Sequence, residues 1–173
     1  MTVVQNYING LIQCLEDLPQ QNLEHIANII VEAWRKEKCV FIMGNGGSAT
    51  TAIHFARDLK IGIAVTGKPR IRAVSLTDSV AVITALANDT GYSSIFKEQL
   101  VGQLKEGDVV IGISASGNSA NVIKAIEYAR RGGATTIGLI GFDGGKLKEL
   151  VDSSVTLSNK DYGQVEDKWK TYI

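Results

Sequence analysis

The chain has 173 residues, of which 45% are hydrophobic, and its 18 basic and 18 acidic side chains give a formal net charge of zero. This balance lacks the basic excess expected of a nucleic-acid-binding protein or of a protein that binds an anionic membrane surface. No apolar run reaches the roughly 18–20 residues of a transmembrane helix, and the N-terminal sequence MTVVQNYINGLIQ lacks the basic stretch of a signal peptide. We therefore expect one cytoplasmic domain spanning residues 1–173, without nucleic-acid or membrane partners.

Residues 1–38 carry apolar side chains at helical spacing, and Pro19 interrupts the pattern. The pattern predicts two N-terminal helices that precede the first strand. We expect both helices to pack outside the core formed by the rest of the chain. Their apolar faces then need cover, which either packing within the monomer or a helix-to-helix contact between subunits would supply.

Short apolar segments then alternate with amphipathic helical patterns. The apolar segments lie at residues 39–43, 71–76, 108–114, 135–140 and 154–157. The helical patterns lie at residues 49–59, 80–87, 95–104, 121–131 and 144–151. Continuous apolar strands between helices indicate strands buried on both faces, and hence a parallel sheet. The sequence therefore predicts an α/β fold, a three-layer αβα sandwich with a five-stranded parallel sheet, which binds ligands at the carboxyl ends of its strands.

The two cysteines carry no signal for a metal or disulfide site. Cys14 and Cys39 have neither CxxC spacing nor a neighbouring His, and the chain contains only two His residues. We expect both thiols to be reduced, and a structural zinc site cannot be assembled from this set.

A glycine-rich loop, GNGGSA, follows the first predicted strand. Gly44, Gly46 and Ala49 fit the pattern G-x-G-x-x-A, which occurs in dinucleotide sites. Such a site needs an acidic residue about 20 residues further on, but the nearest equivalent, Asp78, lies much farther away. Two interpretations remain open: the loop holds an anion at the N-terminus of the following helix, or it is a tight turn capped by Ser48.

A second loop, SASGNSAN, follows the third predicted strand. It offers the hydroxyls of Ser114, Ser116 and Ser119, with Asn118 at the turn and no basic residue. Hydroxyls combined with the N–H groups of a helix N-terminus make a phosphate site from neutral donors. The alternative is an ordinary serine cap. The similar loop after the first strand favours phosphate.

Four longer segments carry a family resemblance: GNGGSATTAIHFARDL, LTDSVAVITALANDTGY, GDVVIGISASGNSANVIKAIEYAR and IGLIGFDGGKL. With them the chain resembles the sugar isomerase (SIS) domain family, and within it the phosphoheptose isomerase branch. The resemblance implies a flavodoxin-like sheet preceded by N-terminal helices, a homotetramer, and a phosphosugar bound across subunits. Loop chemistry and resemblance together give these candidate binding residues: Asn45, Gly46, Gly47, Ser48, Asp89, Ser114, Ser116, Asn118, Ser119 and Glu166.

His54 and Asp58 are the candidate catalytic residues. They are four residues apart in a predicted helix and therefore share one face. Interconversion of an aldose and a ketose moves a proton between two carbons, which needs a base in reach and a group that polarises the oxygen. The resemblance places the family's catalytic carboxylate at Asp58, although the family carries Glu there, which reaches one methylene further. From the residues alone, the favoured interpretation is a solvated Asp58 and a hydrogen-bonded, partly buried His54 without a catalytic role; the resemblance favours the functional one.

The C-terminal residues depart from the family pattern. The resemblance implies histidines in the last helix, one of them a general acid, whereas Trp169 stands at the first of these positions and no His follows His54. Three explanations are open: the last helix is truncated, the site is completed from elsewhere, or the protein does not isomerise sugars. Some relatives hold zinc through residues matching His54 and Asp58, so the resemblance implies zinc as an optional cofactor and none that is required.

The resemblance thus implies a phosphosugar isomerase that converts sedoheptulose 7-phosphate to D-glycero-D-manno-heptose 7-phosphate, a precursor of the heptose in cell-envelope lipopolysaccharide. The alternative is a non-catalytic SIS-domain protein that binds a phosphosugar as a regulator or serves as a scaffold for a protein partner.

Overall fold

The computed structural model describes residues 2–157, and it contains a single five-stranded sheet within that range. Its strands are β1 (Cys39–Gly44), β2 (Arg72–Ser75), β3 (Val109–Ser114), β4 (Thr135–Gly141) and β5 (Ser153–Leu157). All neighbouring pairs are parallel, and the strand order is β2-β1-β3-β4-β5. The central strands β1 and β3 are buried along their whole length, as expected of strands covered on both faces.

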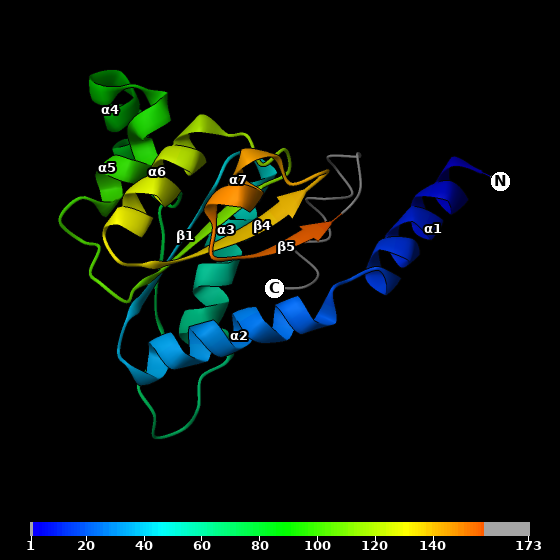
Figure 1. The fold of residues 1–173 in the computed structure, drawn as a ribbon, viewed down its shortest axis with the longest axis horizontal. Coiled ribbons are helices and arrows are strands. Elements are labelled where there is room, and N and C mark those ends of the chain that lie inside the picture. The colour runs from blue at the N-terminus through cyan, green and yellow to red at the C-terminus, as the bar shows by residue number, and fades with distance from the viewer. Residues whose placement is uncertain (1, 158–173) are drawn as a thin grey trace.

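Seven α-helices accompany the sheet in the described part of the chain (Figure 1). They are α1 (Val3–Glu16), α2 (Gln20–Arg35), α3 (Gly47–Arg57), α4 (Val80–Thr90), α5 (Ile95–Leu100), α6 (Ala120–Arg131) and α7 (Gly145–Leu150). A π-helical turn, η1 (Asp58–Gly62), continues α3, and a short 3-10 turn, η2 (Tyr92–Ser94), leads into α5.

Helices cover both faces of the sheet, which confirms the predicted three-layer sandwich. On one face α2 and α3 pack on the strands through residues such as Ile30 and Ala52. On the other face α5, α6 and α7 contribute Phe96, Ile126 and Leu147 to a second apolar core. Because both faces of the sheet are covered, the strand sequences are continuously apolar and do not alternate between apolar and polar residues.

The expectation that both N-terminal helices lie outside the core is wrong for α2. Its Ile26, Ile30 and Ala33 belong to the same core as the strands. The reason is topological: of the helices that connect strands, only α3 lies on this face, so α2 must cover the rest of it. Helix α1 extends away from the body of the molecule (Figure 1), and its apolar side chains are exposed, with Val4 at 67% and Ile12 at 47%.

Some boundaries also differ from those expected. The helix expected over residues 95–104 ends at Leu100, because Val101 has extended backbone angles and Gly102 has a φ of 78°. The helix expected from residue 49 already begins at Gly47. Cys39 is a free, buried cysteine, and burial, assisted by the nearby Asp108 carboxylate, raises the pKa of its thiol. Over residues 2–157, no helix combines the length and the apolar character needed to cross a membrane.

Close packing at Gly112 in β3 gives a first prediction. A Cβ atom at this position would lie 2.8 Å from Cγ1 of Val122 in α6. We expect Gly112→Ala to lower the free energy of unfolding by about 1–3 kcal/mol, the usual cost of overpacking. Denaturant unfolding measures this, and the cost should be smaller when Gly112→Ala is introduced into a Val122→Ala background. An equal cost in both backgrounds would contradict the proposed clash.

Candidate functional site

The centre of the sheet brings the two predicted loops together. Strand β1 lies between β2 and β3, so the chain leaves β1 and β3 towards opposite faces of the sheet. Open parallel sheets bind ligands at such a switch point, beyond the carboxyl ends of the strands. The register pairs Gly44 at the end of β1 with Ile113 near the end of β3, so both loops begin at the same edge.

The first loop is a tight passage from β1 into α3. A Cβ at Gly44 would lie 2.8 Å from backbone atoms of Ser48, and Gly46 has a φ of 56°, so both positions favour glycine. Ser48 is not the helix cap that the capped-turn interpretation assumed. It lies inside α3 and is only 4% exposed, because α3 begins at Gly47 and the cap position belongs to Gly46. No side chain caps the helix there, so Gly46 and Gly47 lie at an uncapped N-terminus.

In the second loop the serine hydroxyls organise the loop itself. The Ser114 Oγ accepts a hydrogen bond from the Gly117 N–H at 3.1 Å and lies 3.1 Å from the Ser119 Oγ. The Ser116 Oγ accepts a bond from the Asn118 N–H at 3.2 Å. These oxygens therefore hold the turn. The groups left to receive a ligand are the Ser116 hydroxyl hydrogen, one hydroxyl hydrogen of the Ser114–Ser119 pair, and N–H groups at the start of α6, which begins at Ala120.

The loop after β4 supports the second loop by direct backbone contact. A Cβ at Gly117 would lie only 2.0 Å from the carbonyl oxygen of Gly144, and Gly117 also has a φ of 64°. The Leu147 N–H donates to the Gly117 carbonyl at 2.9 Å, and the Lys146 N–H donates to Asn118 Oδ1 at 3.2 Å. The shape of the second loop is thus fixed from outside as well as from within.

Two side chains that the sequence analysis did not assign join the loops. The amides of Asn45 and Asn121 form a reciprocal pair, with N···O distances of 2.9 and 2.8 Å, and the Tyr92 hydroxyl donates to Asn45 Oδ1 at 2.9 Å. Asn121 is buried at the start of α6. Both Tyr92 and Asn121 fall within the motifs that carry the family resemblance, but sequence gives no sign that they meet Asn45.

His54 and Asp58 meet as the helical spacing predicted. His54 Nε2 lies 2.8 Å from Asp58 Oδ2, and the Arg57 guanidinium contacts the other carboxylate oxygen. The Asp58 side chain is 21% exposed and the His54 side chain 56% exposed. Asp58 is the first residue of the π-helical turn η1 at the end of α3. The pair thus presents a carboxylate and an imidazole on one side of α3.

The structure does not bring this pair to the loops within one chain. Ser48 and His54 are six positions apart in α3, which is about 9 Å along a helix axis. Among residues 2–157, neither side chain forms a hydrogen bond with the loops. Asp89 lies exposed in the last turn of α4, where its carboxylate accepts a bond from Asn88 Nδ2 at 2.9 Å. Glu166 lies outside the described residues.

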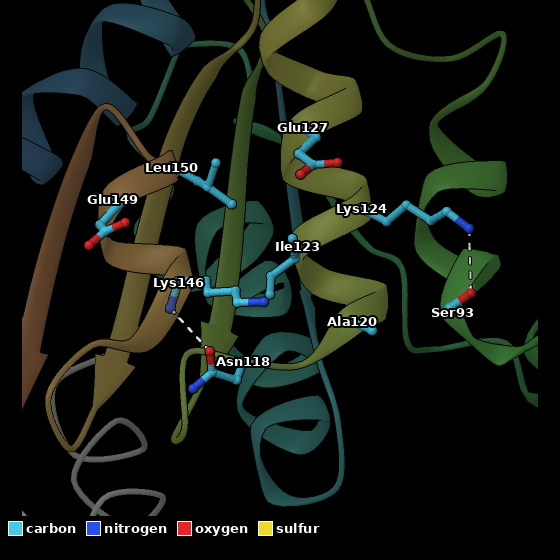
Figure 2. A pocket seen from close by; sticks show the side chains of 9 residues that line it. All are labelled: Ser93, Asn118, Ala120, Ile123, Lys124, Glu127, Lys146, Glu149 and Leu150. Atoms are coloured by element: carbon cyan, nitrogen blue, oxygen red, sulfur yellow. Dashed lines mark hydrogen bonds between the residues drawn. The ribbon is translucent and has the colours of Figure 1, made fainter.

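A groove of about 720 Å³ lies beside the second loop, between α6, α7 and the η2 turn. Figure 2 shows Asn118 at one end, with Lys146 pointing across the groove from α7 and Lys124 reaching from α6 to Ser93. Glu127 and Glu149 balance the two lysines. None of the catalytic candidates lines this groove; of the candidate binding residues it includes Asn118 alone.

The resemblance implied that His54 and Asp58 could help to hold zinc. His54 and Asp58 supply two donors, whereas zinc in proteins takes three or four protein ligands. Among residues 2–157, no group of three or more His, Cys, Asp or Glu side chains is placed to hold a metal ion. The residues described therefore do not make a zinc site by themselves.

Comparison with known proteins identifies the family of this chain. The sequence pattern of the SIS domain family matches residues 5–141. The chain belongs to the SIS domain family. It is 39% identical over 158 residues to the phosphoheptose isomerase of Trichlorobacter lovleyi, covering 91% of this chain and 80% of that protein. It is 37% identical over 164 residues to the phosphoheptose isomerase of Geobacter sulfurreducens, covering 93% and 86%.

The solved structures agree with the sequence matches. A phosphoheptose isomerase from Francisella tularensis superposes with a TM-score of 0.89 at 27% identity, covering 98% of this chain and 89% of that one. Within the SIS domain family, the chain therefore belongs to the phosphoheptose isomerase branch, as its motifs predicted.

The exposure of the His54–Asp58 pair predicts its contribution to stability. Because the His54 side chain is 56% exposed, solvent screens the interaction. We expect Asp58→Asn to change the free energy of unfolding by less than about 1 kcal/mol, as is typical of exposed pairs. Urea unfolding of the two proteins tests this, and a large loss would mean that Asp58 supports the fold rather than a site.

Proposed function

We propose that this SIS-domain protein is a phosphosugar isomerase that interconverts sedoheptulose 7-phosphate and D-glycero-D-manno-heptose 7-phosphate. The observation that carries the proposal is the pairing of the two loops at the sheet switch point, in a chain 37–39% identical to phosphoheptose isomerases over most of its length. The proposal includes a cytoplasmic location, because sugar phosphates are made in the cytoplasm.

The phosphate is proposed to bind at the second loop. Ser114 and Ser116 carry hydroxyl oxygens that accept hydrogen bonds within the loop, and the Ser114 and Ser119 hydroxyls bond to each other. The Ser116 hydrogen and one hydrogen of the Ser114–Ser119 pair are therefore left for an acceptor. The N-terminus of α6 adds N–H donors and the positive end of a helix dipole. Asn45, Gly46, Gly47 and Ser48 of the first loop, together with Asp89, are the proposed contacts to the sugar; Glu166 is proposed on the resemblance alone.

Asp58 is proposed as the base that moves the proton between the two carbons of the sugar. A base takes the proton from the hydroxyl-bearing carbon beside the carbonyl while the carbonyl oxygen gains a proton, which gives an enediol. A proton then returns to the former carbonyl carbon as the other hydroxyl loses its proton and becomes the new carbonyl. His54, 2.8 Å from Asp58 Oδ2, orients the carboxylate and supplies a second proton-transfer group. Two donors do not fit zinc on their own, so no step of this scheme is routed through a metal.

The separation of the pair from the loops suggests how the site is completed. Within one chain the His54 side chain is 56% exposed, and across residues 2–157 neither it nor Asp58 forms a hydrogen bond with the two loops. We propose that a neighbouring subunit of a homotetramer closes the site around the sugar. The exposed apolar side chains of α1, which the described part of the chain leaves uncovered, provide a surface for that assembly.

The activity is tested by incubating the protein with sedoheptulose 7-phosphate and measuring aldose formation, with and without added zinc. Asp58→Asn should lower kcat about 100-fold or more, the usual range for loss of a general base. Ser119→Ala should instead raise KM. Glu24→Gln, an exposed charge on α2, serves as the control and should behave as the parent.

Conversion by the parent protein and its loss in Asp58→Asn would support the proposal. Tight binding of the sugar phosphate without conversion would overturn it and favour a phosphosugar-binding regulator. Absence of binding would favour a scaffold. These outcomes separate the two classes of function that the sequence left open.

The assembly is tested through α1. Ile12 is 47% exposed in the single chain, so Ile12→Glu should not unfold the protein itself. We expect this substitution to shift the sedimentation coefficient from that of a tetramer to that of a smaller species, because a buried charge disfavours the helix contact. Gln5→Glu on the same helix is the matched control, since Gln5 is already polar and exposed. An unchanged coefficient for Ile12→Glu would exclude α1 from the interface.

A further inference from the structure

Asn45 is the point at which three separate segments meet. It follows β1, while Asn121 opens α6 and Tyr92 opens the η2 turn. Asn45 Oδ1 accepts from Asn121 Nδ2 at 2.8 Å and from the Tyr92 hydroxyl at 2.9 Å, and Asn45 Nδ2 donates to Asn121 Oδ1 at 2.9 Å. One amide thus carries three hydrogen bonds to residues 47 and 76 positions away in the sequence.

The backbone of α6 fixes which way these amides point. The Val122 N–H lies 3.0 Å from Asn121 Oδ1, and a backbone N–H only donates. The oxygen of Asn121 must therefore face Val122 and Asn45 Nδ2, which places Asn121 Nδ2 opposite Asn45 Oδ1. Reversing the Asn45 amide would oppose nitrogen to nitrogen and oxygen to oxygen. Tyr92 therefore meets an oxygen and acts as the donor.

This arrangement leaves Asn45 with one group to offer a ligand. An asparagine side chain has two N–H groups and an oxygen that accepts two bonds. Both acceptor positions of Asn45 are filled, by Asn121 and Tyr92, and one N–H is used. The remaining N–H belongs to a half-buried residue at the edge of the sheet where both loops begin. It recognises a hydrogen-bond acceptor, such as a carbonyl, hydroxyl or phosphoryl oxygen.

Tyr92 is itself held in place. Lys124 of α6 donates to the Ser94 hydroxyl at 3.0 Å and to the Ser93 hydroxyl at 3.4 Å, which ties the η2 turn to α6 (Figure 2). Gly91, with a φ of 86°, turns the chain out of α4 directly before Tyr92. The Tyr92 side chain is nevertheless 56% exposed, so its ring is not a major part of either core.

We propose that Tyr92 and Asn121 are positioning residues that lock the Asn45 amide so that its remaining N–H donates to an oxygen of the bound phosphosugar. The proposal rests on the isomerase function above and deepens it. Asn121 sets the orientation of the amide, and Tyr92 saturates its oxygen. Neither residue needs to touch the substrate.

The test is a double-mutant cycle on Tyr92 and Asn45, with KM, kcat and calorimetric binding of sedoheptulose 7-phosphate as readouts. Loss of one neutral hydrogen bond changes an equilibrium about 2- to 10-fold, so we expect Tyr92→Phe to raise KM by that factor while kcat changes less than about 2-fold. In an Asn45→Ala background, Tyr92→Phe should have no further effect on KM, because the amide through which Tyr92 acts on the substrate is absent. Tyr128→Phe, on α6 and remote from Asn45, is the matched control and should match the parent.

Several results would overturn the proposal. If Tyr92→Phe leaves KM unchanged, or if its effect adds fully to that of Asn45→Ala, Tyr92 does not act through the amide. In both cases the parent enzyme still converts the sugar, so the proposed function stands. If the parent protein neither binds nor converts the sugar phosphate, both the proposed function and this inference are wrong. Thermal unfolding of each variant shows whether a change in KM reflects a change in stability.

Discussion

The adjacency of β1 and β3 at the centre of the sheet is the constraint on which the rest of the structure depends. Because the chain leaves these two strands towards opposite faces, their following loops open beside each other at one edge. Neither loop makes a site by itself. The first contributes an uncapped helix start and an asparagine, and the second contributes hydroxyls and the start of α6. The amide pair between Asn45 and Asn121 joins them into one surface.

Polar groups in this surface serve two purposes at once. The serine oxygens and the asparagine amides satisfy donors and acceptors of the loops, and their remaining hydrogens are available to a ligand. A preorganised site costs less to assemble when a ligand arrives, because its side chains are already ordered. The serines of the second loop therefore matter through their geometry as much as through their number.

Sequence predicted the architecture well because its signals are local. Apolar runs such as residues 39–43 and 108–114 indicated strands, and the four-residue spacing of His54 and Asp58 placed them on one helix face, where they meet. What it missed depends on contacts between distant segments. The place of α2 in the core follows from how few connecting helices lie on that face. Asn121 and Tyr92 acquire their roles only when α6 and the η2 turn approach the first loop. Of the two interpretations left open for the first loop, the turn capped by Ser48 is wrong, because the cap position depends on backbone angles at Gly46.

The contact between Gly117 and Gly144 limits how this fold can diversify. A methyl group at residue 117 would strike the backbone of the neighbouring loop at 2.0 Å, so no larger residue fits there without moving two loops together. Substitution is less constrained in segments that make no such close backbone contact. Helix α4, none of whose residues is buried in the single chain, is such a segment. If the second loop binds the phosphate as proposed, that end of the site has little room to change.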